Sequence, residues 1–478
     1  MFDKLYLKDC IIELVEAGVP VQEAMYIYHM NRNIEAEVDT PHGRTRMFRI
    51  EEAVRQGTIF GTTLCGVATN RLNKMGNPDP LILHHKILIQ SPIYVDDIAG
   101  MGEKRQVENT GIKMNGLEKT KKFEFNNKQD KTEVMAMKFN KHRDIQEAMI
   151  EVRKGKISQT KMYKYVGDYY DEKGSNEAKI SKKMEKSKYM ACYVRRMGSY
   201  ENVGQADIQT RLLLVETVVK MTLLSQVETW CSITPKEETT IISKHHEVLC
   251  TVLGMKRSTP YYGIIAETGI WPYTDVITYK KLMFLHHLIH SEAGRISRQI
   301  VVEQEEQQLD GTWYKELEEK SKDMGINITK ENVEKYKKSE WKKLVKERIT
   351  TKIEQDLQKQ YQMKTKLRFL KGKQFKQEQY FEAANADQCK AIMEIRLNMM
   401  DLKMNFKGMY DDTKCTGCFA HEETTEHFLQ CSKIMELTRH NIKTTDFEED
   451  IRSTEWLLQM ANQMETFQEV RNHRLQYK

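Results

Sequence analysis

The stretch Ser91-Pro92-Ile93-Tyr94-Val95-Asp96-Asp97-Ile98-Ala99-Gly100 decides how the N-terminal part of this chain is interpreted. Apolar residues flank two adjacent carboxylates, and the apolar run Ile87-Leu88-Ile89 precedes them. This pattern predicts a tight β-hairpin with Asp96 and Asp97 at its bend. Two carboxylates held on a rigid hairpin suit Mg²⁺, because this small cation takes oxygen ligands in a fixed geometry. A plain polar turn is the alternative, so the neighbouring motifs must decide.

Three further segments lie on either side of the hairpin. Upstream, Gln56 and Gly57 open a loop before an apolar helix expected at residues 64–72; glycine allows close backbone approach and glutamine offers an amide. Downstream, Lys131 begins a Lys-Thr-Glu run, and a lysine there can act as a general acid toward a phosphate leaving group. Further on, aromatic residues alternate around Gly167, as in a strand and its turn. Each segment alone is a weak signal.

In this order the segments resemble the polymerase palm of reverse transcriptases from non-LTR retrotransposons. Two later segments, Ala266-Glu267-Thr268-Gly269-Ile270 and the one from Ile395 to Phe406, are similar to the connector of those elements. The resemblance covers most of the chain and implies an RNA-directed DNA polymerase, a nucleotidyltransferase. The implied partners are an RNA template, a DNA primer or target and dNTPs. No membrane and no protein partner is implied.

The resemblance also implies roles for particular residues. Asp96 and Asp97 would be catalytic ligands of Mg²⁺ or Mn²⁺ in a two-metal phosphoryl transfer, and Lys131 would be a further catalytic residue. The residues expected to bind nucleotide or primer are Gln56, Gly57, Tyr94 and Gly167.

The sequence departs from this family in the first catalytic motif. That motif reads approximately Asp-x-x-Lys-Ala-Phe-Asp, whereas this chain opens with Met1-Phe2-Asp3, which matches only its end. Thr62 is a second departure, since the family usually has proline after the preceding glycine. Two metals also need a carboxylate from the neighbouring strand, so we expect a truncated chain without fingers and without polymerase activity. The alternatives are a non-catalytic nucleic-acid-binding remnant, using basic helices and a zinc knuckle, and an unstable fragment.

A cysteine cluster near the C-terminus predicts a zinc site. Cys415 and Cys418 are followed by His427 and Cys431 in the spacing Cys-x2-Cys-x8-His-x3-Cys. Two thiolates from a knuckle and two ligands one helical turn apart meet the tetrahedral demand of Zn²⁺. His421 competes for the imidazole position, although its gap from Cys418 is tight, and a coincidence of free thiols is the other alternative. Related elements use a similar knuckle to contact nucleic acid, and a basic rim is expected here from Lys403, Lys407, Lys414 and Lys433.

The length and composition limit which kinds of protein this chain can be. The chain has 478 residues, enough for about three domains, and a net charge of +6. Residues 330–376 hold sixteen lysines and arginines against six acidic residues, which predicts either a phosphate-binding stretch or a solvated helical face. The nine unevenly spaced cysteines favour a reducing compartment. No apolar stretch is long enough to span a membrane and no signal peptide is evident, so we expect an intracellular protein, nuclear for the element.

The apolar pattern and the resemblance together predict an α+β chain. The expected order is a partial reverse-transcriptase palm (1–172), thumb-like helices (173–235), a helical connector (236–404), a CCHC zinc knuckle (405–440) and a tail (441–478). In the thumb, four lysines would line a nucleic-acid backbone, namely Lys182, Lys183, Lys186 and Lys188. In the connector, an amphipathic stripe from Val333 through Trp341 to Leu357 is expected to form core. His286 and His290 have metal-binding spacing but are expected to pack within a helix.

Asp96→Asn is expected to abolish primer extension in a longer chain that includes the upstream aspartate motif, because the change removes a ligand of the catalytic metal. Asp97→Asn should be severe as well. The measurement is extension of a DNA primer on an RNA template with Mg²⁺ or Mn²⁺. Nucleic-acid binding by the same variants is the control and should stay unchanged. Extension at the wild-type rate by the Asp96 variant would show that the metal assignment is wrong.

Overall fold

The computed structural model describes residues 7–50, 60–74, 81–83, 87–89, 93–94, 97–109, 111–112, 131–137, 150–152, 155–197, 207–406, 408–438 and 446–476. The chain divides into two compact units. The first unit comprises residues 1–179 and 292–300, and the second comprises residues 180–291 and 301–478.

Three helices form the core of the first unit. Apolar residues at helical spacing, including Cys10, Ile11 and Leu14, are buried against Leu64 and Cys65 of the third helix. The first helix ends before a glycine and a proline, which is where the sequence predicts its end. These helices are α1 (Leu7–Glu16), α2 (Val21–Asn31) and α3 (Gly61–Lys74).

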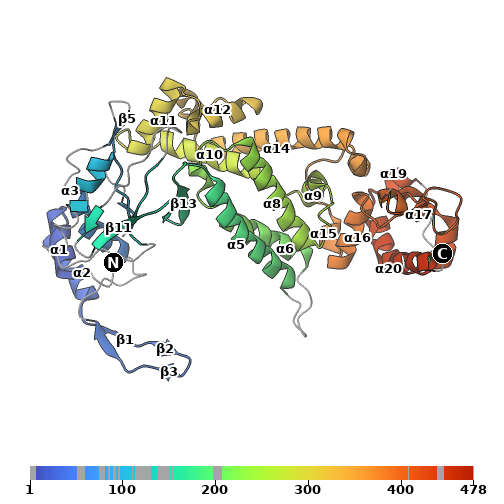
Figure 1. The fold of residues 1–478 in the computed structure, drawn as a ribbon, viewed down its shortest axis with the longest axis horizontal. Coiled ribbons are helices and arrows are strands. Elements are labelled where there is room, and N and C mark those ends of the chain that lie inside the picture. Colours follow the sequence, from blue (N-terminus) through green and yellow to red (C-terminus); the bar gives the residue numbers. More distant parts are fainter. Residues whose placement is uncertain are drawn as a thin grey trace. The chain divides into compact units, whose positions relative to one another are not determined.

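Short strands pair into small sheets in the same unit. The pairs β1 (Ile34–Ala36) with β4 (Phe48–Ile50) and β2 (Asp39–Thr40) with β3 (Gly43–Arg44) build one arm, with β2–β3 at its far end (Figure 1). Three more antiparallel pairs are β5 (Leu81–Leu83) with β6 (Ile87–Ile89), β7 (Ile93–Tyr94) with β8 (Asp97–Ile98), and β12 (Met162–Tyr165) with β13 (Asp168–Asp171). One sheet has three strands, in which β11 (Gly155–Gln159) pairs antiparallel with β10 (Ile150–Val152) and parallel with β9 (Glu133–Val134).

The second unit contains helices and no named strand in its described part. Its first helix, α5 (Glu177–Arg196), begins in the first unit and continues into the second. The helices that follow are α6 (Ile208–Leu214), η2 (Val215–Val219), α7 (Lys220–Leu223), η3 (Val227–Thr229), α8 (Pro235–Leu253), α9 (Tyr261–Thr268), α10 (Tyr273–Ile289), α11 (Ile296–Gln307), α12 (Trp313–Asp323), α13 (Lys330–Val333), α14 (Lys338–Met363), η4 (Thr365–Leu370), α15 (Tyr380–Ala383), α16 (Ala386–Arg396), η5 (Lys403–Phe406), α17 (Thr425–Gln430), α18 (Ser432–Thr438), α19 (Phe447–Asp450) and α20 (Thr454–Gln476).

Helix α14 confirms the predicted amphipathic stripe. Side chains four residues apart, from Trp341 through Ile349 to Leu357, are buried in one large cluster. The Trp341 indole N–H donates to the Leu282 carbonyl of α10 at 3.0 Å, so this large ring is fixed by a hydrogen bond as well as by packing. The lysines of α14 that fall on the opposite face are exposed, among them Lys342, Lys343 and Lys346.

A buried ion pair joins α9 to α16. The Arg396 Nε donates to both Glu267 carboxylate oxygens, at 3.0 and 3.1 Å, and both side chains are almost fully buried. The Tyr380 hydroxyl donates to the same carboxylate at 2.6 Å. Gly269 ends α9 with a φ of +66°, and a Cβ there would lie 2.6 Å from the Gln377 backbone nitrogen. Glycine is therefore required at residue 269, where the end of α9 lies close to the backbone of Gln377.

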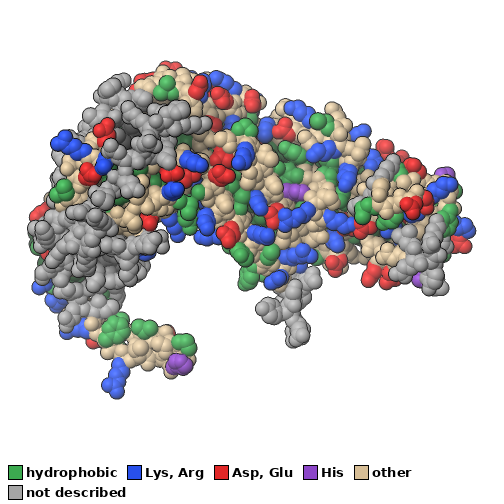
Figure 2. Space-filling view, in the orientation of Figure 1, with side chains coloured by type: hydrophobic (Ala, Val, Ile, Leu, Met, Phe, Trp, Pro, Cys, Tyr) green, Lys and Arg blue, Asp and Glu red, His purple; other side chains and the backbone are tan. Residues whose placement is uncertain are grey.

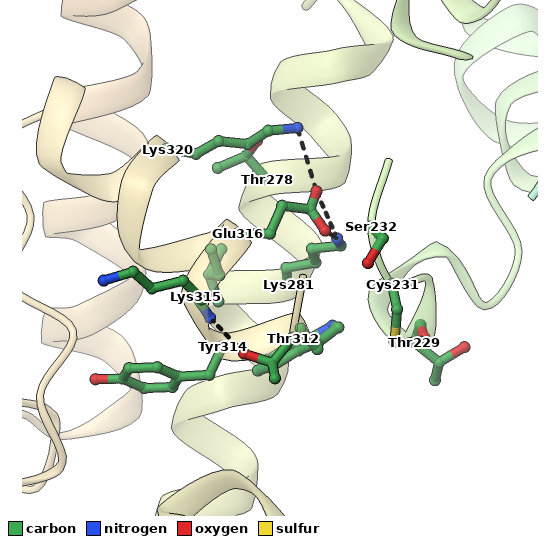
Figure 3. A network of polar contacts seen from close by, with 12 residues as sticks. Thr229, Cys231, Ser232, Thr278, Lys281, Thr312, Tyr314, Lys315, Glu316 and Lys320 are labelled. Atoms are coloured by element: carbon green, nitrogen blue, oxygen red, sulfur yellow. Dashed lines mark hydrogen bonds and ion pairs between the residues drawn. The ribbon is translucent and has the colours of Figure 1, made fainter. Parts of the chain in front are cut away.

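A second buried pair joins α10 to α12, as Figure 3 shows. The Lys281 amine is 1 % exposed and donates to both oxygens of Glu316, at 3.1 and 3.0 Å. Burial lowers the pKa of Lys281, and the Glu316 carboxylate opposes that shift by favouring the charged amine. The Lys320 amine lies 3.4 Å from the same carboxylate, so Glu316 is paired with two lysines.

The described chain is therefore mainly helical with a few small sheets, an α+β composition in which helix dominates. Among the described helices, none is both long enough and apolar enough to cross a membrane.

Glu267→Gln is expected to destabilise the second unit by about 3 kcal/mol, because it leaves the buried Arg396 guanidinium without its charge partner. The measurement is the urea midpoint followed by circular dichroism at the helical band. Glu382→Gln is the matched control, since Glu382 is exposed on neighbouring α15. Equal midpoints for the two variants would show that the ion pair does not contribute to stability.

Candidate metal centre

The four predicted zinc ligands come from one turn and one short helix. Cys415 and Cys418 lie on a turn that follows the bridge between Lys414 and Glu422. The Thr424 hydroxyl caps α17 by accepting the His427 N–H at 3.1 Å, which fixes His427 in the first turn. Cys431 is the residue that ends this helix, so it lies one helical turn after His427.

The ligand atoms converge to the dimensions of a tetrahedral site. All four lie within 4.8 Å of one another. The Cys415 and Cys431 sulfurs are 3.9 Å apart, and the Cys418 sulfur lies 3.3 Å from His427 Nε2. A tetrahedral Zn²⁺ with ordinary bond lengths requires about 3.8 Å between two sulfurs and about 3.6 Å between sulfur and nitrogen. The cysteines are not disulfide-bonded. The residues therefore fit one Zn²⁺ with four protein ligands.

The local environment shifts the pKa of three of the four ligands. Burial raises the pKa of Cys415 to about 12, while N–H groups of the knuckle, including Gly417 at 3.3 Å, oppose the shift. The pKa of Cys418 is lowered despite its desolvation, because the N–H groups of Ala420 and His421 point at its sulfur. Burial lowers the pKa of His427, which keeps its ring neutral and able to coordinate. A bound Zn²⁺ would supply the positive charge that the buried Cys415 thiolate otherwise lacks.

A buried carboxylate beside the site holds the knuckle in place. Glu423 is fully buried and accepts the Thr416 N–H at 3.1 Å and the Thr416 hydroxyl. Its other oxygen accepts the Lys403 N–H at 2.9 Å and faces the Arg471 guanidinium of α20 at 3.4 Å. One carboxylate thus connects the Cys-x2-Cys turn, η5 and the C-terminal helix. Groups that fix metal ligands in this way tune affinity as well as geometry.

The site shares its core with the long helices. Cys415, Cys431, Phe428 and Leu429 belong to the same buried cluster as α14, α16 and α20. The ring of Phe428 meets that of Phe467 on α20 edge to face. Figure 1 shows α16, α17, α19 and α20 together at the C-terminal end of the chain. At Gly417, a Cβ would lie 2.6 Å from the Ile434 side chain, so the turn tolerates no larger residue without repacking α18.

The expected polymerase residues fall in part within the described chain. The predicted hairpin is present as the pair β7–β8, in which Tyr94 is directly opposite Asp97. Asp97 therefore starts the second strand, while Asp96 lies outside the described residues, as do Gln56 and Gly57. Lys131 is exposed, and its carbonyl accepts the Tyr163 hydroxyl at 3.1 Å.

Gly167 lies in the turn between β12 and β13. Both Val166 and Gly167 have positive φ, 47° and 86°, which is the conformation of a two-residue hairpin loop. The contact between Lys131 and Tyr163 brings the Lys-Thr-Glu run beside this hairpin. The sequence predicted these two segments as separate motifs, and the structure shows that they are neighbours.

Other sequence expectations at the metal end need correction. The Lys403 side chain is 2 % exposed and donates to the Lys414 carbonyl at 2.9 Å, so it is wrong to place it on a basic rim. Lys414 and Lys433 are exposed, whereas Lys407 lies outside the described residues. His421 is not among the four converging ligands and its ring lies 5.0 Å from that of His427. The role of Glu423 was missed, since nothing in sequence distinguishes it from the adjacent Glu422.

The prediction that the α10 histidines pack within the helix is confirmed for His286, which is buried, whereas His290 is exposed at the C-terminal end of α10. The His286 ring stacks on His290 at 4.0 Å, and His286 Nε2 contacts the Tyr336 carbonyl at 2.9 Å. Within the described ranges, the Cys415 cluster is the one group of three or more Cys, His, Asp or Glu side chains arranged to hold a metal.

No protein-family model matches this chain, and no curated protein matches it. Function must therefore be inferred from the motif order and from the site itself.

Cys418→Ser is expected to abolish binding of one equivalent of Zn²⁺ and to lower the melting temperature of the full chain by several degrees, because the ligands are part of the helical core. Zinc content by mass spectrometry and thermal circular dichroism, with and without chelator, are the measurements. Cys231→Ser is the control, since Cys231 is exposed and outside the cluster. A chelator that removes no metal and shifts no transition would contradict the site.

Proposed function

We propose that this chain is a reverse-transcriptase-like protein of the non-LTR retrotransposon kind, which binds RNA and DNA strands and is held together by a structural Zn²⁺. The convergence of Cys415, Cys418, His427 and Cys431 carries this proposal, because such a knuckle is what the motif order implies at this end. Four protein ligands leave no open position for substrate, so the metal is structural rather than catalytic.

Charge distribution indicates which surfaces would bind the nucleic acid. From residue 408 onward the sequence contains thirteen aspartates and glutamates and eight lysines and arginines. A phosphate backbone would be repelled by such a surface. Helix α5, in contrast, has seven basic and two acidic residues. We therefore assign binding to the basic helices and a scaffolding role to the zinc knuckle.

The polymerase reaction is the catalytic part of the proposal. A primer 3′-hydroxyl would attack the α-phosphorus of a dNTP and release pyrophosphate, with Asp96 and Asp97 binding the Mg²⁺ or Mn²⁺ ions that stabilise the developing charge. Lys131 would donate a proton to the pyrophosphate. The remaining residues would position nucleotide and primer, namely Gln56, Gly57, Tyr94 and Gly167. The antiparallel pairing of Tyr94 with Asp97 supports this proposal, because it puts Asp97 at the start of a hairpin strand.

A non-catalytic nucleic-acid-binding protein is the second candidate. The basic surface of α5 and the exposed lysines of α14 favour it, since both are independent of the Asp96–Asp97 hairpin. Binding and catalysis are therefore measured separately.

The full chain should bind labelled single-stranded RNA and DNA with an affinity that falls steeply with salt, because lysine–phosphate contacts release counterions. Fluorescence anisotropy between 50 and 300 mM salt (roughly the range over which the effect is large) is the measurement. Primer extension on an RNA template is run in parallel. Binding with extension supports the polymerase, binding without extension supports the second candidate, and no binding at low salt overturns both.

A further inference from the structure

The outer face of α5 combines basic side chains with two exposed aromatic rings. Tyr189 and Tyr193 are 70 % and 66 % exposed, which is high for residues of this size. They lie four residues apart, so their rings are neighbours on one side of the helix. At three- and four-residue spacings on the same side lie Lys182, Lys186 and Arg196, all exposed.

The inward lysines of α5 have a different role. Lys183 is buried, stands 5.1 Å from the centroid of the Trp230 ring and donates to the Ser225 carbonyl. Lys179 likewise stands 4.2 Å from the centroid of the Tyr170 ring. These contacts attach the helix to its surroundings. The expectation that Lys183 lines a nucleic-acid backbone is therefore wrong.

The outward side chains do not contribute to this packing. No ion-pair partner is found for Lys182, Lys186 or Arg196 among the described residues, whereas Lys188 lies 3.8 Å from Glu247. Glu185 is the one acidic residue on the outer face. In the area that Figure 1 labels α5 and α6, Figure 2 shows basic side chains interspersed with apolar ones. The basic and aromatic side chains of the outer face thus contribute neither to the packing nor to the ion pairs of the described fold.

We propose that Tyr189 and Tyr193 stack on the bases of a single-stranded nucleic acid, while Lys182, Lys186 and Arg196 bind its phosphates. The basic residues fit a polyanion, and the rings fit a polyanion whose bases are unpaired, because a duplex hides its base faces. This inference rests on the proposed nucleic-acid binding and specifies its ligand. RNA and DNA single strands share this chemistry, so both are probes in the test.

The first test changes the rings. The double variant Tyr189→Ala, Tyr193→Ala of the full chain should bind 15-nucleotide oligo(dT) and oligo(U) at least about 10-fold more weakly than wild type, since each stacked base contributes appreciably. Binding to a blunt 15-base-pair duplex should change little. Phenylalanine at both positions should restore single-strand affinity. The control is Tyr26→Ala, because Tyr26 is 64 % exposed on α2 and outside this face. Circular dichroism checks that each variant is folded.

The second test changes the charges. Lys182→Gln with Lys186→Gln should make the slope of log affinity against log salt shallower by about 1.4 for single strands, as expected for two lost phosphate contacts. The tyrosine variants should keep the wild-type slope.

The outcomes separate this inference from the proposed function. Wild-type affinity in the double tyrosine variant would overturn the stacking site and leave nucleic-acid binding in place. Equal weakening for duplex and single strand would overturn base stacking and indicate backbone contact alone. Absence of binding by the wild-type chain to every probe would overturn both.

Discussion

Two of the four candidate zinc ligands lie in the hydrophobic core of the helical unit, and the packing of the C-terminal helices depends on that arrangement. Cys415 and Cys431 are buried with Phe428 and Leu429 in the cluster that also contains the inner residues of α14, α16 and α20. An isolated knuckle has almost no apolar interior and depends on its metal to fold. Here a bound metal would act on residues that hydrophobic burial already holds in place, so coordination and packing would each restrict the other.

Glu423 extends this coupling through hydrogen bonds. A fully buried carboxylate is costly unless each oxygen has partners. Glu423 meets that demand with donors from Thr416, Lys403 and Arg471, which belong to three different segments. The same solution recurs at Glu267, whose partners Arg396 and Tyr380 come from two other elements. Burying each of these carboxylates costs hydration free energy, and the surrounding donors offset that cost. Removing a donor would therefore leave the buried charge less well compensated.

Charge is divided between the ends of the helical unit. The zinc end is acidic, while α5 is basic and exposes two tyrosines. A zinc knuckle inside an acidic surface is suited to organising helices, whereas a basic helix with exposed rings is suited to binding a strand. The charged groups that stabilise the fold, such as Glu423 and Lys183, are buried and have partners. The exposed basic residues Lys182, Lys186 and Arg196 of α5 have no such structural role in the described part of the chain and can contact a polyanion.

The sequence by itself determined what depends on local spacing. The hairpin of Tyr94 and Asp97, the buried stripe of α14 and the convergence of the four candidate zinc ligands were predicted, because helical, strand and ligand periodicities act within a few residues. The spacing also favoured His427 over His421, whose gap from Cys418 is tight, and the structure confirms that choice.

Only the tertiary structure decided which charged residues are buried. Lys183 and Lys182 are adjacent and chemically identical, yet one stands against Trp230 and the other is exposed. Glu423 and Glu422 differ in the same way, and so does Lys403 from Lys414. Lys183 meets Trp230 and Glu423 meets Arg471, and both partners are tens of residues away in the sequence. Local pattern carries no information about such partners, since burial of a charge is stable only where distant elements supply the compensating contacts.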